Sequence, residues 1–139
     1  MNKQAIFTWP IRVYYEDTDA GGVVYHSNYL NFMERARTEW LRSLGFEQPQ
    51  VKAELGIIIV VHSLSVDFKS PAYFNDMLEI HCQITKVGRG SIEMEQKITR
   101  EHALLIKAEV KLAFVNADTF KPVGIPANMK AAMLPKLVH

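Results

Sequence analysis

Cysteine is almost absent from the sequence, which has one among 139 residues. A single thiol cannot form an internal disulfide framework or supply the paired cysteines of a zinc motif. Long apolar runs are also missing: the longest nearly unbroken one, Leu55 to Val61, has seven residues, whereas a membrane-spanning helix needs about 20. The first ten residues contain no continuous apolar stretch of the kind that a secretory signal requires. We therefore expect a cytoplasmic protein without a membrane span.

Neither sign of charge dominates the sequence. Sixteen Lys and Arg stand against 15 Asp and Glu, which gives a formal net charge of +1. This balance is unlike that of a strongly basic nucleic-acid binder, and 48% hydrophobic residues are too many for an intrinsically disordered chain. The length suits one domain, so we expect residues 1–139 to form a single folded unit with no nucleic-acid partner.

A helical period begins near Ser27 and continues for four or more turns. Apolar residues recur three and four positions apart on one side of it, and charged residues occupy the other side. Ser27 or Asn28 can cap its start, and Gly45 stands where a left-handed residue is favoured at the end. The apolar stripe consists of Tyr29, Phe32, Met33, Ala36, Trp40 and Leu44, widened by Leu30 and Leu41.

Most of the remaining chain alternates with the period of a β-strand. A first strand is predicted over Ile11 to Tyr15, after Pro10, and a mixed segment around Pro49 follows the helix. Short links with turn residues separate the later strands, which favours antiparallel hairpins. Those strands are predicted over Ile57–Phe68, Leu78–Thr85, Ile92–Thr99 and Leu104–Phe114, and a short helix over Ala127–Leu134 closes the chain. The pattern predicts an α+β fold in which an antiparallel sheet wraps around one central helix.

A cluster of carboxylates lies between the first strand and the long helix. Glu16, Asp17 and Asp19 precede two glycines, and such a cluster can simply form a turn in water. A strand, a glycine-rich turn and a helix start in series can also aim a carboxylate at the free backbone N–H groups of that helix. Those amides suit an oxygen that gains negative charge, and an ionised carboxylate suits water activation or direct attack. Together they indicate acyl hydrolysis.

The histidines and the single thiol allow several readings. His26 is an acid, a donor to substrate or a local helix cap, and its position alone does not decide among them. The other four histidines lack metal-binding spacing, so we expect no metal site. Cys82 stands on the apolar face of its strand, which favours a buried structural thiol over a nucleophile.

Some residues fit both a structural and a ligand-binding role. Arg89, between two glycines, fits a hairpin turn, and with Lys86 it can offer cations to a phosphorylated ligand. Lys69 is expected to be an exposed loop cation. Met33 and Trp40 belong to the helix stripe and hence to the core, although parts of such a stripe can line an acyl pocket.

The stretch from Val13 to Leu44 closely resembles the hot-dog-fold acyl-CoA thioesterases. It reads Asp-x-Asp-x-x-Gly-x-Val-Tyr-His, then Asn-Tyr and Glu-Arg-Ala-Arg, and it is most similar to the YbgC-type branch of the 4-hydroxybenzoyl-CoA thioesterase-like family. This branch is associated with the bacterial Tol-Pal system, and the resemblance extends to lipid metabolism as the setting.

The resemblance implies a hot-dog fold, dimers whose sheets join, and often tetramers. It places the catalytic carboxylate on Asp19 and the amide donor at His26, and it assigns substrate binding to Gly22, Tyr25 and Arg89. Arg89 would meet the phosphates of coenzyme A (CoA), but its neighbouring glycines replace residues that are basic in some relatives.

From these observations we expect an acyl-CoA thioesterase that releases a free acid and CoA, without a cofactor. Asp19 would act as general base or nucleophile, and the backbone N–H near His26 would hold the thioester oxygen. The expected partners are acyl-CoA, acyl carrier protein and further copies of the chain in a homodimer or homotetramer. Two alternatives stay open: a hydratase or dehydratase that uses the His26 side chain, and a non-catalytic module that binds acyl thioesters or acyl carrier protein.

Overall fold

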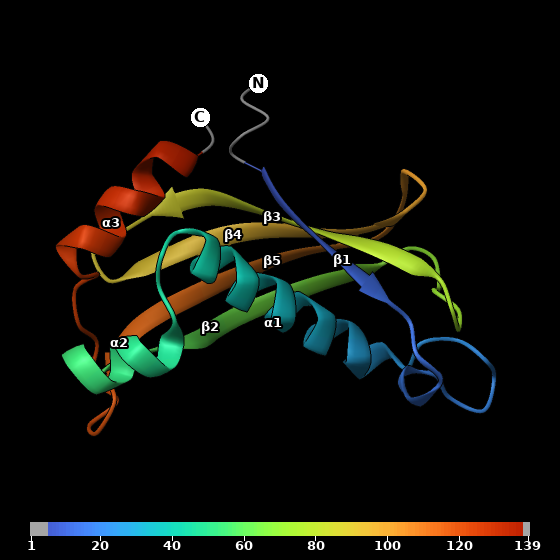
Figure 1. Ribbon diagram of the computed structural model, residues 1–139, viewed down its shortest axis with the longest axis horizontal. Helices are drawn as coiled ribbons and strands as arrows, with labels where there is room; N and C mark the ends of the chain where they lie inside the picture. Colours follow the sequence, from blue (N-terminus) through green and yellow to red (C-terminus); the bar gives the residue numbers. More distant parts are fainter. Residues whose placement is uncertain (1–5, 138–139) are drawn as a thin grey trace.

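An antiparallel five-stranded sheet carries the fold of residues 6–137, which are the residues that the computed structural model describes (Figure 1). Every neighbouring pair of strands is antiparallel, and the strand order is β1-β3-β4-β5-β2. The first and second strands along the chain therefore form the two edges. The strands are β1 (Ile6–Arg12), β2 (Ile57–Phe68), β3 (Met77–Val87), β4 (Ser91–Arg100) and β5 (Ala103–Asn116).

The long helix α1 (His26–Ser43) lies across one face of this sheet (Figure 1). Most of its predicted apolar stripe is confirmed: Leu44 is partly buried, whereas Leu30 is exposed because it lies at the border of the stripe. The buried members are Tyr29, Phe32, Met33, Ala36, Trp40 and Leu41. The predicted end is also confirmed: Gly45 has a φ of +98°, a left-handed conformation that glycine adopts without steric strain. The α+β class and the hot-dog architecture follow from this arrangement of helix and sheet.

The first strand differs from the prediction. β1 begins at Ile6, passes through Pro10 and ends at Arg12, whereas a strand from Ile11 to Tyr15 was expected. Proline is tolerated because β1 is an edge strand, where one side of the backbone needs no partner. Tyr15 instead opens a short 3-10 turn, Tyr15–Asp17, that leads into the carboxylate cluster.

The segment around Pro49 is also different from the prediction, because it forms helix α2 (Gln48–Leu55). Only Val51 of this helix is buried, so its sequence has almost no apolar period. Pro49 stands in the first turn, where a missing N–H does no harm, and Gly56 ends the helix with a φ of +66°. The closing helix α3 (Ala127–Met133) is confirmed and ends one residue before the predicted boundary.

The four later strands occupy the predicted segments, and hairpins join β3 to β4 and β4 to β5. One polar residue, Gln96, stands in the inward row of β4 and is fully buried. Its Nε2 donates to the backbone oxygen of Met33 (3.0 Å) and to Sγ of Cys82 (3.2 Å), and its Oε1 accepts from Nη1 of Arg37 (2.9 Å). Gln96 therefore fastens the sheet to the middle of α1.

The outer edge of β2 exposes apolar side chains. Val61, Leu64 and Phe68 are 48%, 38% and 51% exposed, and no strand among residues 6–137 pairs with the outer side of β2. Unpaired edges with apolar side chains favour association with another strand. Within residues 6–137, no helix combines the length and the apolar character that crossing a membrane requires.

Candidate active site

The turn from Asp17 to Tyr25 joins the sheet to the start of α1 and holds Asp19 at its tip. An isolated β-bridge between Thr18 and Val24 closes the base of the turn. Inside it, the Asp19 N–H donates to the Val23 oxygen (2.9 Å), and the Gly22 N–H donates to the Asp19 oxygen (3.0 Å). These bonds fix the backbone of Asp19 and leave its side chain exposed to solvent.

One oxygen of the Asp19 carboxylate is held and the other is free. Oδ1 accepts the Gly21 N–H at 2.8 Å, whereas Oδ2 has no hydrogen-bond partner among the residues that the structure describes. A Cβ at Gly21 would lie 3.2 Å from Asp19 Oδ1, so glycine leaves room for the carboxylate. Gly22, to which the resemblance assigns substrate binding, is exposed in the same turn, and its φ of +80° favours glycine.

The start of α1 offers unpaired backbone donors. Tyr25 is the N-cap and makes no side-chain capping bond, so the expected cap by Ser27 or Asn28 is wrong. The Asn28 N–H donates to the Tyr25 oxygen at 2.8 Å. No acceptor within residues 6–137 takes the N–H of His26 or Ser27. These two amides stand at the positive end of the helix dipole and suit an anionic or polarised oxygen.

Asp17 behaves differently from Asp19, because its carboxylate is buried. Oδ2 accepts the Tyr14 N–H and Oδ1 accepts Nδ2 of Asn28, both at 2.8 Å. The backbone oxygen of Asp17 accepts the Tyr25 N–H at 3.0 Å. Asp17 is therefore a structural carboxylate that joins the turn to the first turn of α1, while Asp19 and Glu16 face solvent.

An open pocket of about 290 Å³ adjoins the start of α1. His26 lines it together with Lys69, and the centroids of the His26 and Tyr25 rings lie 4.4 Å apart. Lys69 is an exposed loop cation, as predicted. It also lines this pocket with His26, because the chain returns to α1 after β2, which no local pattern reveals. The other lining residues are Val24, Tyr29, Phe68, Ser70 and Pro71.

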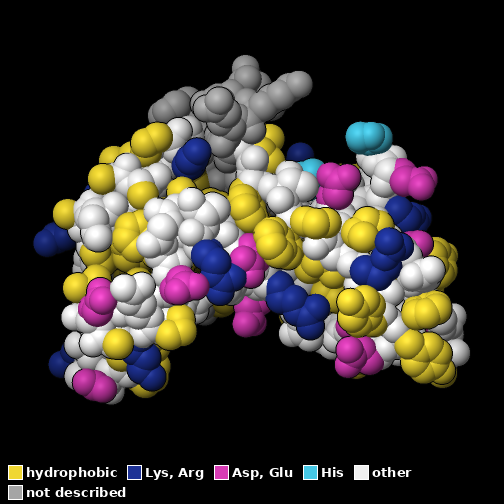
Figure 2. Space-filling view, viewed as in Figure 1, with side chains coloured by type: hydrophobic (Ala, Val, Ile, Leu, Met, Phe, Trp, Pro, Cys, Tyr) yellow, Lys and Arg dark blue, Asp and Glu magenta, His cyan; other side chains and the backbone are white. Residues whose placement is uncertain are grey.

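Tyr29 closes the inner side of this pocket. Its hydroxyl oxygen accepts the Ala72 N–H at 2.9 Å, and burial raises the pKa of the hydroxyl. Aromatic residues also gather outside the pocket. Figure 2 shows apolar side chains at the end of the molecule where β1 ends and β3 begins. There the Tyr15 and Phe74 rings pack edge to face, with 5.9 Å between their centroids. The turn that carries Asp19 lies at the same end of the sheet (Figure 1).

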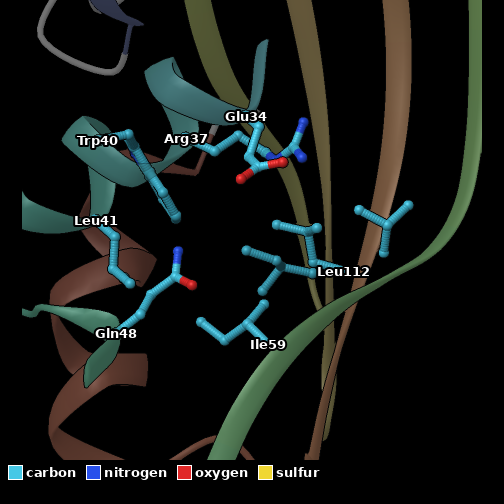
Figure 3. Close-up of a pocket in the computed structure, with 9 residues that line it drawn as sticks. Glu34, Arg37, Trp40, Leu41, Gln48, Ile59 and Leu112 are labelled. Atoms are coloured by element: carbon cyan, nitrogen blue, oxygen red, sulfur yellow. The ribbon is translucent and has the colours of Figure 1, made fainter. Parts of the chain in front are cut away.

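A second pocket of about 240 Å³ lies further along α1, between this helix and the sheet (Figure 3). Arg37 and Trp40 face Ile59 and Leu112 across it, and Glu34 lies beside Arg37 in the lining. Burial lowers the pKa of the Arg37 guanidinium below its usual value. Trp40 is thus both a core residue and part of a pocket wall, whereas Met33 is wholly buried.

Arg89 stands far from Asp19 in this chain. β3 begins at Met77, which pairs with Arg12 beside the carboxylate turn, and it ends at Val87 just before the turn that holds Arg89. Ten residue steps at about 3.3 Å separate these ends by roughly 30 Å, and Figure 1 shows the β3–β4 hairpin beside α3. One chain therefore does not bring Arg89 and Asp19 together. Lys86 lies near the same hairpin, 3.8 Å from Glu93.

Cys82 has the environment expected of a structural thiol. It is fully buried on β3, and burial raises its pKa to about 12. Only a negligible share of the thiol is ionised near neutral pH, which makes it a poor nucleophile.

Comparisons with known proteins agree with this geometry. The sequence profile of the thioesterase superfamily matches residues 21–107. The chain is 46% identical over 126 residues to an acyl-CoA thioesterase YbgC of Haemophilus influenzae, covering 91% of this chain and 93% of that protein. It is 38% identical over 128 residues to an acyl-CoA thioesterase YbgC of Helicobacter pylori, covering 86% and 93%.

Solved structures agree at the level of the fold. A probable thioesterase from Bartonella henselae superposes with a TM-score of 0.84 at 34% identity, over 87% of this chain and 99% of that one. A 4-hydroxybenzoyl-CoA thioesterase from Pseudomonas sp. strain CBS-3 superposes with a TM-score of 0.86 over 91% and 98%. At 22% identity, this second likeness concerns the fold alone.

Proposed function

This chain belongs to the thioesterase superfamily, and from that premise we propose that Asp19 and the start of α1 form the active site of an acyl-CoA thioesterase. Relatives that are 46% identical to it are named acyl-CoA thioesterase or acyl-CoA thioester hydrolase, and we carry that substrate class over to this chain. One observation supports the site best: within residues 6–137, one oxygen of the Asp19 carboxylate has no hydrogen-bond partner, and neither do the His26 and Ser27 amides at the adjoining start of α1.

The arrangement supplies both requirements of thioester hydrolysis: donors that polarise the carbonyl group and a carboxylate that promotes attack on its carbon. The carbonyl oxygen of the substrate accepts the N–H of His26 or Ser27, and the helix dipole stabilises the negative charge that develops on it. Asp19 either removes a proton from a water molecule that attacks the carbonyl carbon, or attacks that carbon itself. In the second route a mixed anhydride forms and water hydrolyses it. In both routes the carbon–sulfur bond breaks and CoA leaves as the thiol after taking up a proton.

The backbone of His26, and not its imidazole, carries the polarising role in this proposal. The side chain is exposed and lies against Tyr25, and we infer that Tyr25 and His26 border the substrate at the pocket mouth. A hydratase or dehydratase would instead need the imidazole to move a proton next to the carbonyl. Hydration of crotonyl-CoA without thiol release would support that alternative over hydrolysis, and specific binding of acyl carrier protein without turnover would support a non-catalytic module.

A second copy of the chain completes the site in this proposal. Two β2 edges that pair antiparallel about their middle bring the Phe68 end of each strand beside the Ile57 end of the other. The pocket at His26 and Phe68 would then adjoin the partner's pocket at Trp40 and Ile59, which we assign to the acyl group. The exposed apolar side chains of β2 support this pairing.

The separation of Arg89 from Asp19 also supports an assembly of several copies. We propose that Arg89, with Lys86, meets the CoA phosphates of a site whose Asp19 belongs to another copy, in a dimer or tetramer. We further place the protein in the cytoplasm and in lipid metabolism, with acyl carrier protein as an alternative carrier of the acyl group. An association with the Tol-Pal system belongs to the same proposal and rests on the YbgC-type resemblance.

A thiol-release assay over acetyl, medium-chain, long-chain and aromatic CoA esters tests the proposed activity. We expect release of free CoA with at least one ester class, and the ranking of the esters will define the acyl pocket. The same esters should release thiol about 100-fold more slowly or less with an Asp19→Asn variant at equal concentration. A wild-type protein that releases no thiol from any of these esters would contradict the proposal.

A further inference from the structure

Asp17 and Asn28 connect the turn that carries Asp19 to the helix that carries the free amides. We propose that these two residues are a positioning pair, which sets the distance between the Asp19 carboxylate and the His26 and Ser27 amides without touching the substrate. The inference rests on the proposed function, because it assigns these residues a part in the same reaction.

The hydrogen bonds of the turn fall into two groups. Those of Asp19 are local: its own N–H, its backbone oxygen and its Oδ1 bond to Val23, Gly22 and Gly21. They shape the turn but do not place it against α1. The bonds that reach α1 and its N-cap start from Asp17, whose Oδ1 accepts Asn28 Nδ2 (2.8 Å) and whose backbone oxygen accepts the Tyr25 N–H (3.0 Å).

The chemistry of Asp17 suits this role. A carboxylate has two oxygens and donates nothing when ionised, so it can accept from two separate segments at once. Here one oxygen accepts the Tyr14 N–H, two residues after β1 ends, and the other accepts Nδ2 of Asn28, the third residue of α1. Charge-assisted bonds of this kind are shorter and stronger than neutral ones. With only 6% of Asp17 exposed, little water competes for these oxygens.

Each end of the Asn28 side-chain amide makes one hydrogen bond. Its Nδ2 donates to Asp17, and its Oδ1 accepts Nδ2 of Asn31 at 3.2 Å. An aspartate at position 28 would be favourable for the isolated helix, because acidic residues in the first turn complement the dipole. It would nevertheless place two carboxylates within hydrogen-bond distance, and their repulsion would push the turn away from α1.

A reciprocal exchange of the two side chains tests the pair. Asn28→Asp creates the like-charge contact, and the double variant Asp17→Asn with Asn28→Asp restores one carboxylate and one amide. Asn128→Asp is the matched control, because it makes the same substitution in the first turn of another helix, α3, on an exposed residue that does not contact the pair. Each purified protein is assayed for kcat and KM by thiol release with the best CoA ester, and its fold is checked by circular dichroism.

We expect Asn28→Asp to lower kcat about 100-fold, as a displacement of about 1 Å at a reacting group can do, with KM changed only a few-fold. The double variant should recover kcat to within about tenfold of wild type, which a general loss of stability would not do. Asn128→Asp should keep the wild-type kcat. Equal kcat for Asn28→Asp and Asn128→Asp, or no recovery in the double variant, would overturn the inference.

Further measurements cover a variant that does not fold and separate a failure of the pair from a failure of the proposed function. If Asn28→Asp does not fold, Asn28→Ala decides the question: it removes the donor without a new charge, and an unchanged kcat would overturn the pair. A wild-type protein without thioesterase activity would contradict the proposed function. An active wild type whose kcat ignores the Asp17 and Asn28 exchange would contradict the positioning pair alone.

Discussion

Asp17 and Asp19 stand two residues apart in one turn and have opposite environments. The Asp17 carboxylate is buried and accepts two hydrogen bonds, whereas the Asp19 carboxylate is exposed and accepts one, from Gly21. A buried and fully bonded carboxylate stabilises structure, and an exposed one with a free oxygen remains available for chemistry. Asp17 and Asp19 therefore have different roles because one is buried and the other is exposed, although they are the same type of residue.

The Asp19→Asn variant should lose activity while it keeps its fold. The amide preserves size and can still accept the Gly21 N–H, but it cannot act as base or nucleophile, so kcat should fall about 10²- to 10⁴-fold. Thiol release and circular dichroism are measured on the same protein. Glu16→Gln is the matched control, because Glu16 is an exposed carboxylate in the 3-10 turn just before it. Near wild-type turnover in Asp19→Asn would reject the assignment.

The start of α1 allows the backbone amide of His26 to be tested apart from the imidazole. His26→Ala keeps the N–H, so we expect a fall in kcat of about tenfold, or 1.4 kcal/mol of barrier. His26→Pro also removes the N–H, and a proline at the first helical position preserves the helix. The N-cap Tyr25 already has the extended conformation (φ −63°, ψ 134°) that a following proline requires.

His26→Pro should therefore lower kcat by a further 10²-fold or more, the usual effect of losing an oxyanion donor. The measurement is kcat for wild type and both variants, with ultraviolet monitoring of crotonyl-CoA beside it. Equal rates for the alanine and proline variants would show that this amide does not polarise the substrate. Crotonyl-CoA hydration that disappears in His26→Ala would show a hydratase that depends on the imidazole.

Much of the fold could be predicted because its signals are local. The stripe from Tyr29 to Trp40 and the glycine at Gly45 define α1, and the period of two defines four strands. α2 was missed because a helix with one buried residue leaves no apolar stripe to detect. The early start of β1 was missed because Pro10 looks like a strand boundary unless the strand is known to be an edge.

The candidate site was predictable only in part, because only some of its contacts lie between residues that are close in the sequence. A strand, a turn and a helix start that follow one another along the chain place Asp19 and the His26 amide near each other by sequence alone. The burial of Asp17 depends on Tyr14 and Asn28 from both sides of the turn. The position of Arg89 depends on the direction of β3, which the alternating pattern of a strand does not reveal.

Salt should affect substrates differently according to whether they carry the nucleotide. Arg89 and Lys86 are exposed, and salt screens exposed charges because the Debye length falls to about 8 Å near 0.15 M. Raising the salt concentration should increase KM for CoA esters more than it lowers kcat, and N-acetylcysteamine thioesters of the same acyl group should show a much smaller change. Equal salt dependence for both substrates would argue against a cationic nucleotide site.

Cys82 should resist thiol reagents in the folded protein. Its pKa is raised to about 12 by burial, so at pH 8 the thiolate that reacts is only about one part in 10⁴. A chromogenic disulfide reagent should detect almost no thiol in the native protein and one per chain in denaturant. Rapid labelling of the native protein would show that the inner face of β3 opens readily.

The β2 edge should control both assembly and activity. Light scattering of the wild type should give a multiple of the 15.9 kDa chain mass, because pairing of two β2 strands covers Val61, Leu64 and Phe68. Leu64→Lys places a charge on that edge without disturbing the buried core, since Leu64 is 38% exposed. We expect this variant to shift towards the monomer mass and to lose most of its thioesterase activity, because the acyl pocket loses the wall that the partner supplies.

Trp9→Lys on β1, the other edge of the sheet, is the matched control and should keep the wild-type mass. An active monomer, whether wild type or Leu64→Lys, would show that one chain holds a complete site.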